Sequence, residues 1–232
     1  MKLTIIICVF NEIKTIKKLL QKVNNIKLFK GIKKEVIVVD NCSIDGTREF
    51  LKKINNKANY KIIFQKQNYG KGSSVIKGIS KSTGDFIVLQ DADLEYEPKN
   101  FNKYLRYFIK NKKLHAVYGS RIIGRQKHFY YKLNRIAVVF LGFLINSLFK
   151  GTFTDVATNH KMIRADIVKK LDLRSKRFNI DFEISAKLAK YKYNYKECSI
   201  SYNPRKYSEG KKINFKDAIE ALLTIFKIYI FK

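Results

Sequence analysis

The chain has 232 residues, 46% of them hydrophobic and 13% aromatic, which is enough apolar material for a core and excludes a disordered chain. Its 48 Lys and Arg against 19 Asp and Glu leave a net charge of +29, which favours phosphate-bearing partners: nucleic acid, anionic lipid or phosphorylated small molecules. A general bias toward Lys, Asn and Ile explains the same charge without any partner.

In the first half of the chain, short β-branched runs alternate with amphipathic stretches. We expect strands at Leu3–Val9, Glu35–Val39, Lys61–Phe64 and Phe86–Leu89, and helices at Glu12–Val23, Thr47–Ile54 and Lys71–Ser80. This alternation predicts an α/β fold, with a central, mostly parallel sheet flanked by helices. The first run lacks a small-residue cleavage site, so we interpret it as a buried strand rather than a signal peptide.

Polar residues follow each of these four strands. They are Asn11-Glu12, Asp40-Asn41, the segment 68–72 and Asp91-Ala92-Asp93. Because the carboxyl ends of parallel strands meet at one edge of a sheet, these clusters are expected to line one ligand site.

The second half is less regular. Ala116–Gly119 is expected to be a strand that ends in Ser120-Arg121, and Ile136–Phe149 and Ala218–Phe231 are apolar helices of about 14 residues, too short to span a bilayer. Two interpretations stay open for these helices: they are core helices, or they lie in a membrane interface with flanking cations near lipid phosphates.

The chain shows no internal repeat and no linker, which favours one continuous domain. Its three cysteines, Cys8, Cys42 and Cys198, are far apart and form no C-x-x-C pair. A disulfide framework or zinc ribbon is therefore not expected, and the reducing cytoplasm is favoured.

The carboxylates of Asp91 and Asp93 come directly after a predicted buried strand. If the chain turns there, both can approach one divalent cation, with Glu95 as a third oxygen ligand. Hard oxygen ligands suit Mg²⁺ or Mn²⁺, which keep open positions for substrate phosphates. We therefore expect a metal–diphosphate site.

Two further segments are candidates for nucleotide contacts. Asp40 stands at a strand end where a carboxylate can accept from a ribose hydroxyl or a base N–H, whereas the Asp45–Thr47 turn fits a helix cap. At the start of the helix near Gly70, free backbone N–H groups and Lys71 are expected to meet an anion. Neither a Walker A loop nor a Rossmann glycine fingerprint is present, because Gln65 and Val75 break the spacing.

Taken in order, these segments resemble the family 2 glycosyltransferases of GT-A fold. The similarity runs through Val9–Glu12, Val39–Thr47, Asn68–Gly72 and Gly84–Glu95. Later segments resemble the branch that contains dolichyl-phosphate mannose synthase and bacterial polyprenyl-phosphate relatives: Gly119–Arg121, Phe178–Glu183 and Arg205–Lys212. The resemblance implies a nucleotide-sugar-binding half over residues 1–125 and an acceptor-binding half over 126–232.

The resemblance also implies roles for individual residues. Asp40 is expected near the base or ribose, beside Phe10, Asn11 and Glu12, and Lys71 near an anion. Asp91, Asp93 and Glu95 are expected to hold Mg²⁺ or Mn²⁺, and Asp93 and Arg205 are also expected to be catalytic. Arg121, Arg205 and Lys211 are expected to face donor or acceptor phosphates. Asp181 and Glu183 align with an acidic pair near the acceptor, although plain helix-start charge explains them equally well.

The implied activity is inverting transfer of a sugar from GDP-mannose or a UDP-sugar to a polyprenyl phosphate, at the cytoplasmic face of an anionic membrane. A glycan or glycolipid hydroxyl is the alternative acceptor, and it requires a base such as Asp181 or Glu183. A nucleic-acid-binding module is a third class. It is disfavoured because the lysines are spread along the chain and no recognition motif is present.

Overall fold

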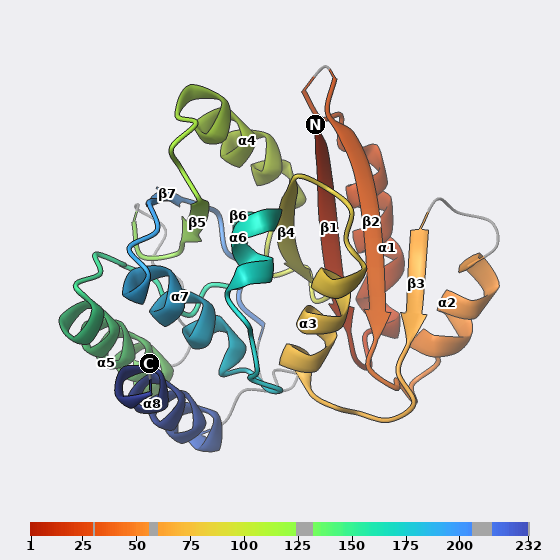
Figure 1. The fold of residues 1–232 in the computed structure, drawn as a ribbon. Helices are drawn as coiled ribbons and strands as arrows, with labels where there is room; N and C mark the ends of the chain where they lie inside the picture. Colours follow the sequence, from red (N-terminus) through yellow and green to blue (C-terminus); the bar gives the residue numbers. More distant parts are fainter. Residues whose placement is uncertain (30, 56–59, 124–131, 206–214, 232) are drawn as a thin grey trace.

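The computed structural model describes residues 1–29, 31–55, 60–123, 132–205 and 215–231 (Figure 1). Its centre is a seven-stranded sheet in the order β3-β2-β1-β4-β6-β5-β7. The strands are β1 (Lys2–Val9), β2 (Lys33–Asp40), β3 (Tyr60–Phe64), β4 (Phe86–Asp91), β5 (Ala116–Ser120), β6 (Lys161–Arg164) and β7 (Tyr195–Ser199).

The sheet is mostly parallel, as the sequence predicted. β1 pairs in parallel with β2 and β4, β2 with β3, and β5 with β7. Only β6 runs antiparallel to its two neighbours, β4 and β5. The five strands expected from the sequence are confirmed within one or two residues at each end; β6 and β7 were not predicted.

Helices cover both faces of the sheet. They are α1 (Ile13–Asn25), α2 (Thr47–Asn55), α3 (Lys71–Lys81), the short 3₁₀ turn η1 (Pro98–Asn100), α4 (Phe101–Lys110), α5 (Lys132–Phe149), α6 (Ala165–Lys170), α7 (Ile180–Lys190) and α8 (Phe215–Ile230). One core cluster joins the sheet to α1, α2 and α4, and the other joins it to α3 and α5–α8.

Side chains along β1 alternate between these two clusters. Ile5 and Ile7 belong to the cluster with α1, and Ile6 belongs to the cluster with α3. All three are fully buried. A strand covered on both faces has no polar side, which is why β1 is a continuous apolar run in the sequence.

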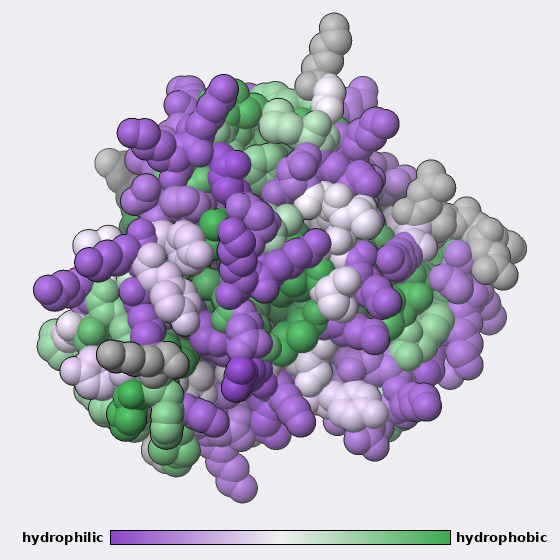
Figure 2. All heavy atoms as spheres, in the orientation of Figure 1, coloured by the Kyte–Doolittle hydropathy of each residue, from purple (hydrophilic) through white to green (hydrophobic). Residues whose placement is uncertain are grey.

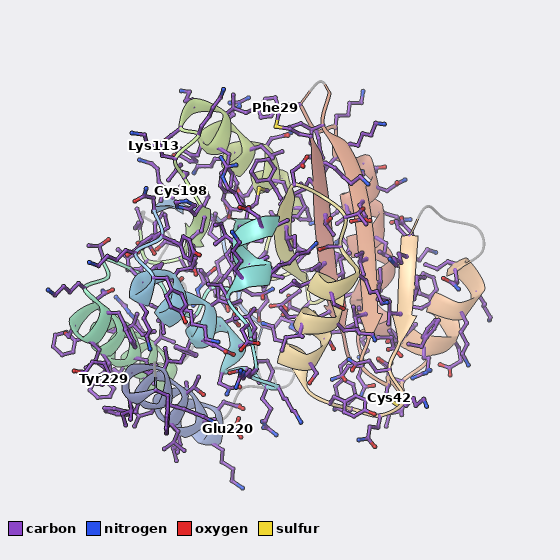
Figure 3. The ribbon with its side chains drawn as sticks, viewed as in Figure 1. Phe29, Cys42, Lys113, Cys198, Glu220 and Tyr229 are labelled. Atoms are coloured by element: carbon purple, nitrogen blue, oxygen red, sulfur yellow. The ribbon has the colours of Figure 1, made fainter. Side chains whose placement is uncertain are left out.

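The carboxyl ends of β1, β2 and β3 point to the same edge, the lower edge in Figure 1. Cys42, just after β2, lies at this edge in Figure 3, while Phe29, which precedes β2, lies at the opposite one. The polar segments that follow the strands are therefore brought together, as expected.

The helices α5 and α8 pack on each other and each has a buried and an exposed face. Ile145 and Ile225 are fully buried, whereas Phe143 and Leu223 are each 64% exposed. Figure 2 shows hydrophobic side chains gathered over these two helices at the lower left. The buried faces fit the interpretation as core helices, while the membrane-interface interpretation of the exposed faces stays a prediction. Among the described residues, no helix combines the length and apolarity needed to cross a bilayer.

Candidate active site

Hydrogen bonds join the segments after β1 and β2 into one wall of the site. The backbone N–H of Asn11 donates to Ser43 Oγ (2.9 Å), and Asn11 Oδ1 accepts from the backbone N–H of Ile44 (2.9 Å). The N–H of Glu12 donates to Thr47 Oγ1 (2.9 Å). Asn11 adopts a positive φ of 53°, which turns the chain sharply after β1. Phe10, which precedes this turn, is half-buried.

Asp40 is fully buried at the end of β2 and faces Arg48. Its Oδ2 lies 3.3 Å from Arg48 Nη1, and its Oδ1 accepts from the N–H of Ser43. The neighbouring Asn41 instead holds the loop before α3: its Oδ1 accepts from the N–H of Tyr69 (2.9 Å). Asp40 is thus placed beside the sheet edge, whereas the Asn41 amide serves the fold of the adjacent loop.

The carboxylates of Asp91, Asp93 and Glu95 form an acidic cluster after β4. Asp93 Oδ1 accepts from the backbone N–H of Glu95 (3.0 Å), which folds the loop back on itself. Burial, together with the charges of Asp91 and Glu95, raises the pKa of Asp93 to about 8. Such a site favours a cation, because one would relieve the repulsion among these carboxylates.

Arg205 supplies one such cation from the far end of the chain. Its guanidinium lies 3.0 and 3.2 Å from the two carboxylate oxygens of Glu12 and 3.3 Å from Asp93 Oδ2. Its backbone N–H donates to Glu95 Oε1 (2.9 Å), and Tyr202 Oη donates to Glu95 Oε2 (2.7 Å). The structure therefore brings Glu12, Asp93, Glu95 and Arg205 together, a grouping that the sequence did not predict, and directs Glu12 toward Arg205.

Two carboxylates of the cluster fit a divalent metal. In the part of the chain that the structure describes, no group of three or more His, Cys, Asp or Glu side chains is arranged to hold a metal. Glu95 already accepts through both oxygens from Tyr202 and Arg205. Mg²⁺ and Mn²⁺ are commonly held by one or two carboxylates plus substrate phosphates, so Asp91 and Asp93 suit an ion that arrives with a diphosphate.

A second charged group lies beside the first. Lys71 Nζ is 3.3 Å from Asp91 Oδ2 and 3.3 Å from Asp181 Oδ2. The fully buried Lys161 donates to Asp181 Oδ1 (2.8 Å). Burial alone would raise the pKa of Asp181, but Lys161 and Lys71 lower it. Asp181 is therefore an ionised anchor for two lysines.

Glu183 is buried two residues further along α7 and has different partners. Its carboxylate accepts from the backbone N–H groups of Arg174 (3.0 Å) and Ser175 (2.7 Å), and it pairs with Lys187 (2.7 Å). The two acids predicted as a pair therefore have separate partners: Asp181 contacts Lys71 and Lys161, and Glu183 binds the loop at 174–175.

That loop covers the start of α3. The N–H of Ser73 donates to the carbonyl oxygen of Lys176 (3.1 Å). A Cβ on Gly70 would lie 2.4 Å from the same oxygen, and a Cβ on Gly72 would lie 2.1 Å from the carbonyl oxygen of Ser175. The N–H of Ser73 is therefore not free to bind an anion, and the expectation is wrong at this residue. The Lys71 side chain stays a candidate for binding one.

Arg121 forms an ion pair with a residue that sequence reasoning missed. Its Nε and Nη2 each lie 2.7 Å from an oxygen of the fully buried Asp155, and its guanidinium lies over the Tyr202 ring. Arg121 therefore contacts the residue that binds Glu95. Lys211 lies outside the described residues.

Sequence reasoning also missed Lys161, Arg48 and Tyr202. Nothing in the sequence around Lys161 indicates that its side chain is fully buried. The antiparallel strand β6 brings this lysine within hydrogen-bonding distance of Asp181. One signal was present for Arg48: it lies in the first turn of the helix that follows Asp40.

Comparison with known proteins identifies the family. The family model described as "Glycosyl transferase family 2" matches residues 4–172. The chain belongs to glycosyltransferase family 2. This family 2 chain is 29% identical to a dolichol-phosphate mannosyltransferase of Pyrococcus furiosus over 98% of its own length and 64% of that relative, so it spans just under two thirds of it. It is 34% identical to a cholesterol galactosyltransferase of Borreliella burgdorferi over 40% of its own length and 25% of that relative.

The fold is also that of a solved glycosyltransferase structure. Glucosyl-3-phosphoglycerate synthase from Mycobacterium tuberculosis, in complex with Mn²⁺, UDP and phosphoglyceric acid, superposes with a TM-score of 0.71 at 14% identity, covering 100% of this chain and 79% of that one. The GT-A fold expected for this chain is thereby confirmed. The roles of its individual site residues remain predictions.

Proposed function

We propose that this glycosyltransferase moves a sugar from a nucleoside diphosphate, such as GDP-mannose or a UDP-sugar, to the phosphate of a polyprenyl phosphate at a membrane surface. The observation that carries the proposal is the state of the two candidate bases. Asp181 is paired with two lysines and Glu183 with two backbone N–H groups and a lysine.

A hydroxyl acceptor has to lose a proton as it attacks. Asp181 is poorly suited to accept it because Lys161 and Lys71 lower its pKa, and the Glu183 carboxylate is already bound to two backbone N–H groups. A phosphate oxygen is already ionised at neutral pH and needs no base. The Pyrococcus relative is named for dolichol phosphate, which supports the same acceptor class.

On the donor side, the protein supplies charge for the departing diphosphate. Asp91 and Asp93 would hold Mg²⁺ or Mn²⁺, which neutralises charge that develops on a leaving diphosphate. Lys71 and Arg205 lie against these carboxylates and place fixed cations beside the same position. Asp40 would bind the ribose or base. Attack from the face opposite the leaving group inverts the anomeric carbon.

The exposed apolar face of α5 and α8 would rest on the membrane. It comprises Ile136, Val139, Phe140 and Phe143 of α5 with Ile219, Leu223, Phe226, Tyr229 and Ile230 of α8. Glu220 and Tyr229 of α8 are labelled in Figure 3. The net charge of +29 adds attraction to anionic lipid head groups, which together with buried apolar area determines interfacial binding.

Membrane attachment is tested by vesicle flotation with the variant Phe143→Ser/Leu223→Ser. We expect the variant to lose most of its binding to anionic vesicles while keeping its thermal unfolding temperature. Ile109→Ser, which changes another exposed apolar residue on α4, is the matched control and should float like the unchanged protein. Equal flotation of all three proteins would contradict attachment through α5 and α8.

The acceptor is tested by the release of nucleoside diphosphate in the presence of Mn²⁺. Release should require a polyprenyl phosphate and should not be stimulated by the corresponding polyprenol or by a free saccharide. The second candidate, transfer to a glycan or glycolipid hydroxyl, is supported by the cholesterol galactosyltransferase relative. It predicts the reverse pattern.

A further inference from the structure

We propose that Glu183 is a positioning residue: it clamps the segment 174–176 across the start of α3 and thereby fixes Lys71 between Asp91 and Asp181. The effect of Lys71 on the donor rests on the proposed function. The placement of Lys71 by Glu183 does not, since it concerns only contacts within the chain.

The clamp begins with the buried carboxylate of Glu183. One oxygen lies 2.7 Å from the N–H of Ser175, and both lie within 3.1 Å of the N–H of Arg174. Lys187, one turn later, neutralises the carboxylate. Hydrogen bonds to an ionised acceptor are the strong ones, so this anchor holds two consecutive peptide groups.

The clamped segment packs tightly against the start of α3. The carbonyl oxygens of Ser175 and Lys176 approach Gly72 and Gly70 so closely that neither position can carry a Cβ. The hydrogen bond from Ser73 to Lys176 ties the first turn of α3 to the segment. The start of α3 therefore follows any movement of residues 174–176.

Lys71 is the first residue of α3, and its placement depends on that start. Its ammonium group is equidistant from Asp91 and Asp181, at 3.3 Å from each, and lies 5.7 Å from the centre of the Phe178 ring. Phe178 lies two residues beyond the clamped segment. Lys71 is thus connected to the segment through the first turn of α3 and lies beside Phe178, and Glu183 holds the segment in place.

Amide hydrogen exchange tests the mechanical part without any substrate. In Glu183→Gln, an amide group replaces one accepting oxygen, so exchange at 174–176 should rise about 10- to 100-fold, and the rise should extend to the start of α3 at 72–74. The matched control is Glu35→Gln, whose carboxylate accepts from the N–H of Thr83 (2.9 Å) at the opposite end of the sheet. That variant should change exchange near residue 83 only. A rise in Glu183→Gln confined to 174–176 overturns the proposal.

A double-variant cycle tests the consequence for the donor. Lys71→Met and Glu183→Gln should each weaken calorimetric binding of Mn²⁺–GDP or Mn²⁺–UDP, whichever the unchanged protein binds, by about tenfold, and the double variant should be no weaker than Lys71→Met. Additive losses overturn the proposal. If the unchanged protein binds neither nucleotide, the proposed function fails and hydrogen exchange alone decides.

A pH–rate profile separates positioning from base catalysis. A positioning residue leaves the shape of the profile unchanged in Glu183→Gln and lowers its height. Loss of the acidic limb, with unchanged exchange at 72–74, would make Glu183 a base and overturn the proposal.

Discussion

The pairs Asp91/Asp93 and Asp181/Glu183 have the same spacing in the sequence, and their surroundings in the structure are opposite. Asp91 ends β4 and Asp93 follows it, and burial together with the Asp91 charge raises the pKa of Asp93. Asp181 and Glu183 lie in the first turn of α7, where Asp181 meets Lys71 and Lys161 while Glu183 binds the backbone of residues 174–175.

The difference comes from the backbone that carries each pair. On an α-helix, residues i and i+2 do not face each other, so two neighbouring acids are sent to different surroundings. At the end of β4, the hydrogen bond from the Glu95 N–H to Asp93 folds the loop back, and Asp93 stays near enough to Asp91 for the Asp91 charge to raise its pKa; we call these two residues the converging pair. Two acids at this spacing are therefore expected to share a ligand when they lie on a turn, and to contact different partners when they lie on a helix.

The largest effect is expected at the converging pair. Asp93→Asn should lower the transfer rate by about a thousandfold, because a lost metal contact costs several kcal/mol of transition-state stabilisation. Folding should not suffer, since burial beside Asp91 and Glu95 raises the pKa of Asp93 and makes its charge unfavourable in the native state. Measurements of kcat and of Mn²⁺-dependent thermal shifts with GDP and UDP check the expected loss of activity. The unfolding temperature without ligand checks the folding, and a lower value in Asp93→Asn would contradict the expectation that folding does not suffer.

At the diverging pair, the first expectation concerns stability. Asp181→Asn leaves the fully buried Lys161 without its countercharge and should lower the free energy of unfolding by about 3–5 kcal/mol. Adding Lys161→Met to the same variant should restore much of the loss, as urea unfolding would show. A stable single variant would mean that the lysine finds another partner.

A smaller effect is expected for Arg205→Lys. An ammonium group cannot span both oxygens of Glu12 as the guanidinium does, so one charged hydrogen bond is lost. That loss corresponds to about 1.5 kcal/mol, or roughly tenfold in kcat/KM. An unchanged kcat/KM would show that the contacts of the Arg205 guanidinium do not contribute to the reaction.

The smallest effect concerns a glutamate that, like Glu183, binds backbone but lies far from the site. Burial alone would raise the pKa of Glu35, but hydrogen bonds from Thr4 and Thr83 lower it. The stability it contributes is present above the pKa of an unfolded glutamate and lost as the pH falls through its own lower value. Glu35→Gln should therefore cost about 1 kcal/mol or less at pH 7 and progressively less on acidification, measured by urea unfolding. A cost that grows on acidification would contradict this sign.

The sequence was sufficient for the first half of the fold and for placing Asp91 and Asp93 at the end of β4. Apolar runs such as Leu3–Val9 are strands because both faces are covered, and the polar segments after them meet because the strands are parallel. The sequence was not sufficient for Lys161, Asp155 and Glu183. Their roles arise from contacts between distant segments across an antiparallel strand and a closely packed loop, which no local pattern records.

The loop at 174–177 also reaches α8. Arg177 lies 3.2 Å from Asp217 and 3.1 Å from Glu220, both on α8, while the preceding residue holds the start of α3. A helix proposed to rest on lipid and a lysine proposed to steady a departing diphosphate are thus attached to adjacent residues. A tilt of α8 on a bilayer would move Arg177, and the adjacent Lys176 would pass that movement to the start of α3. The position of Lys71, and with it the transfer rate, would then differ between free solution and vesicles.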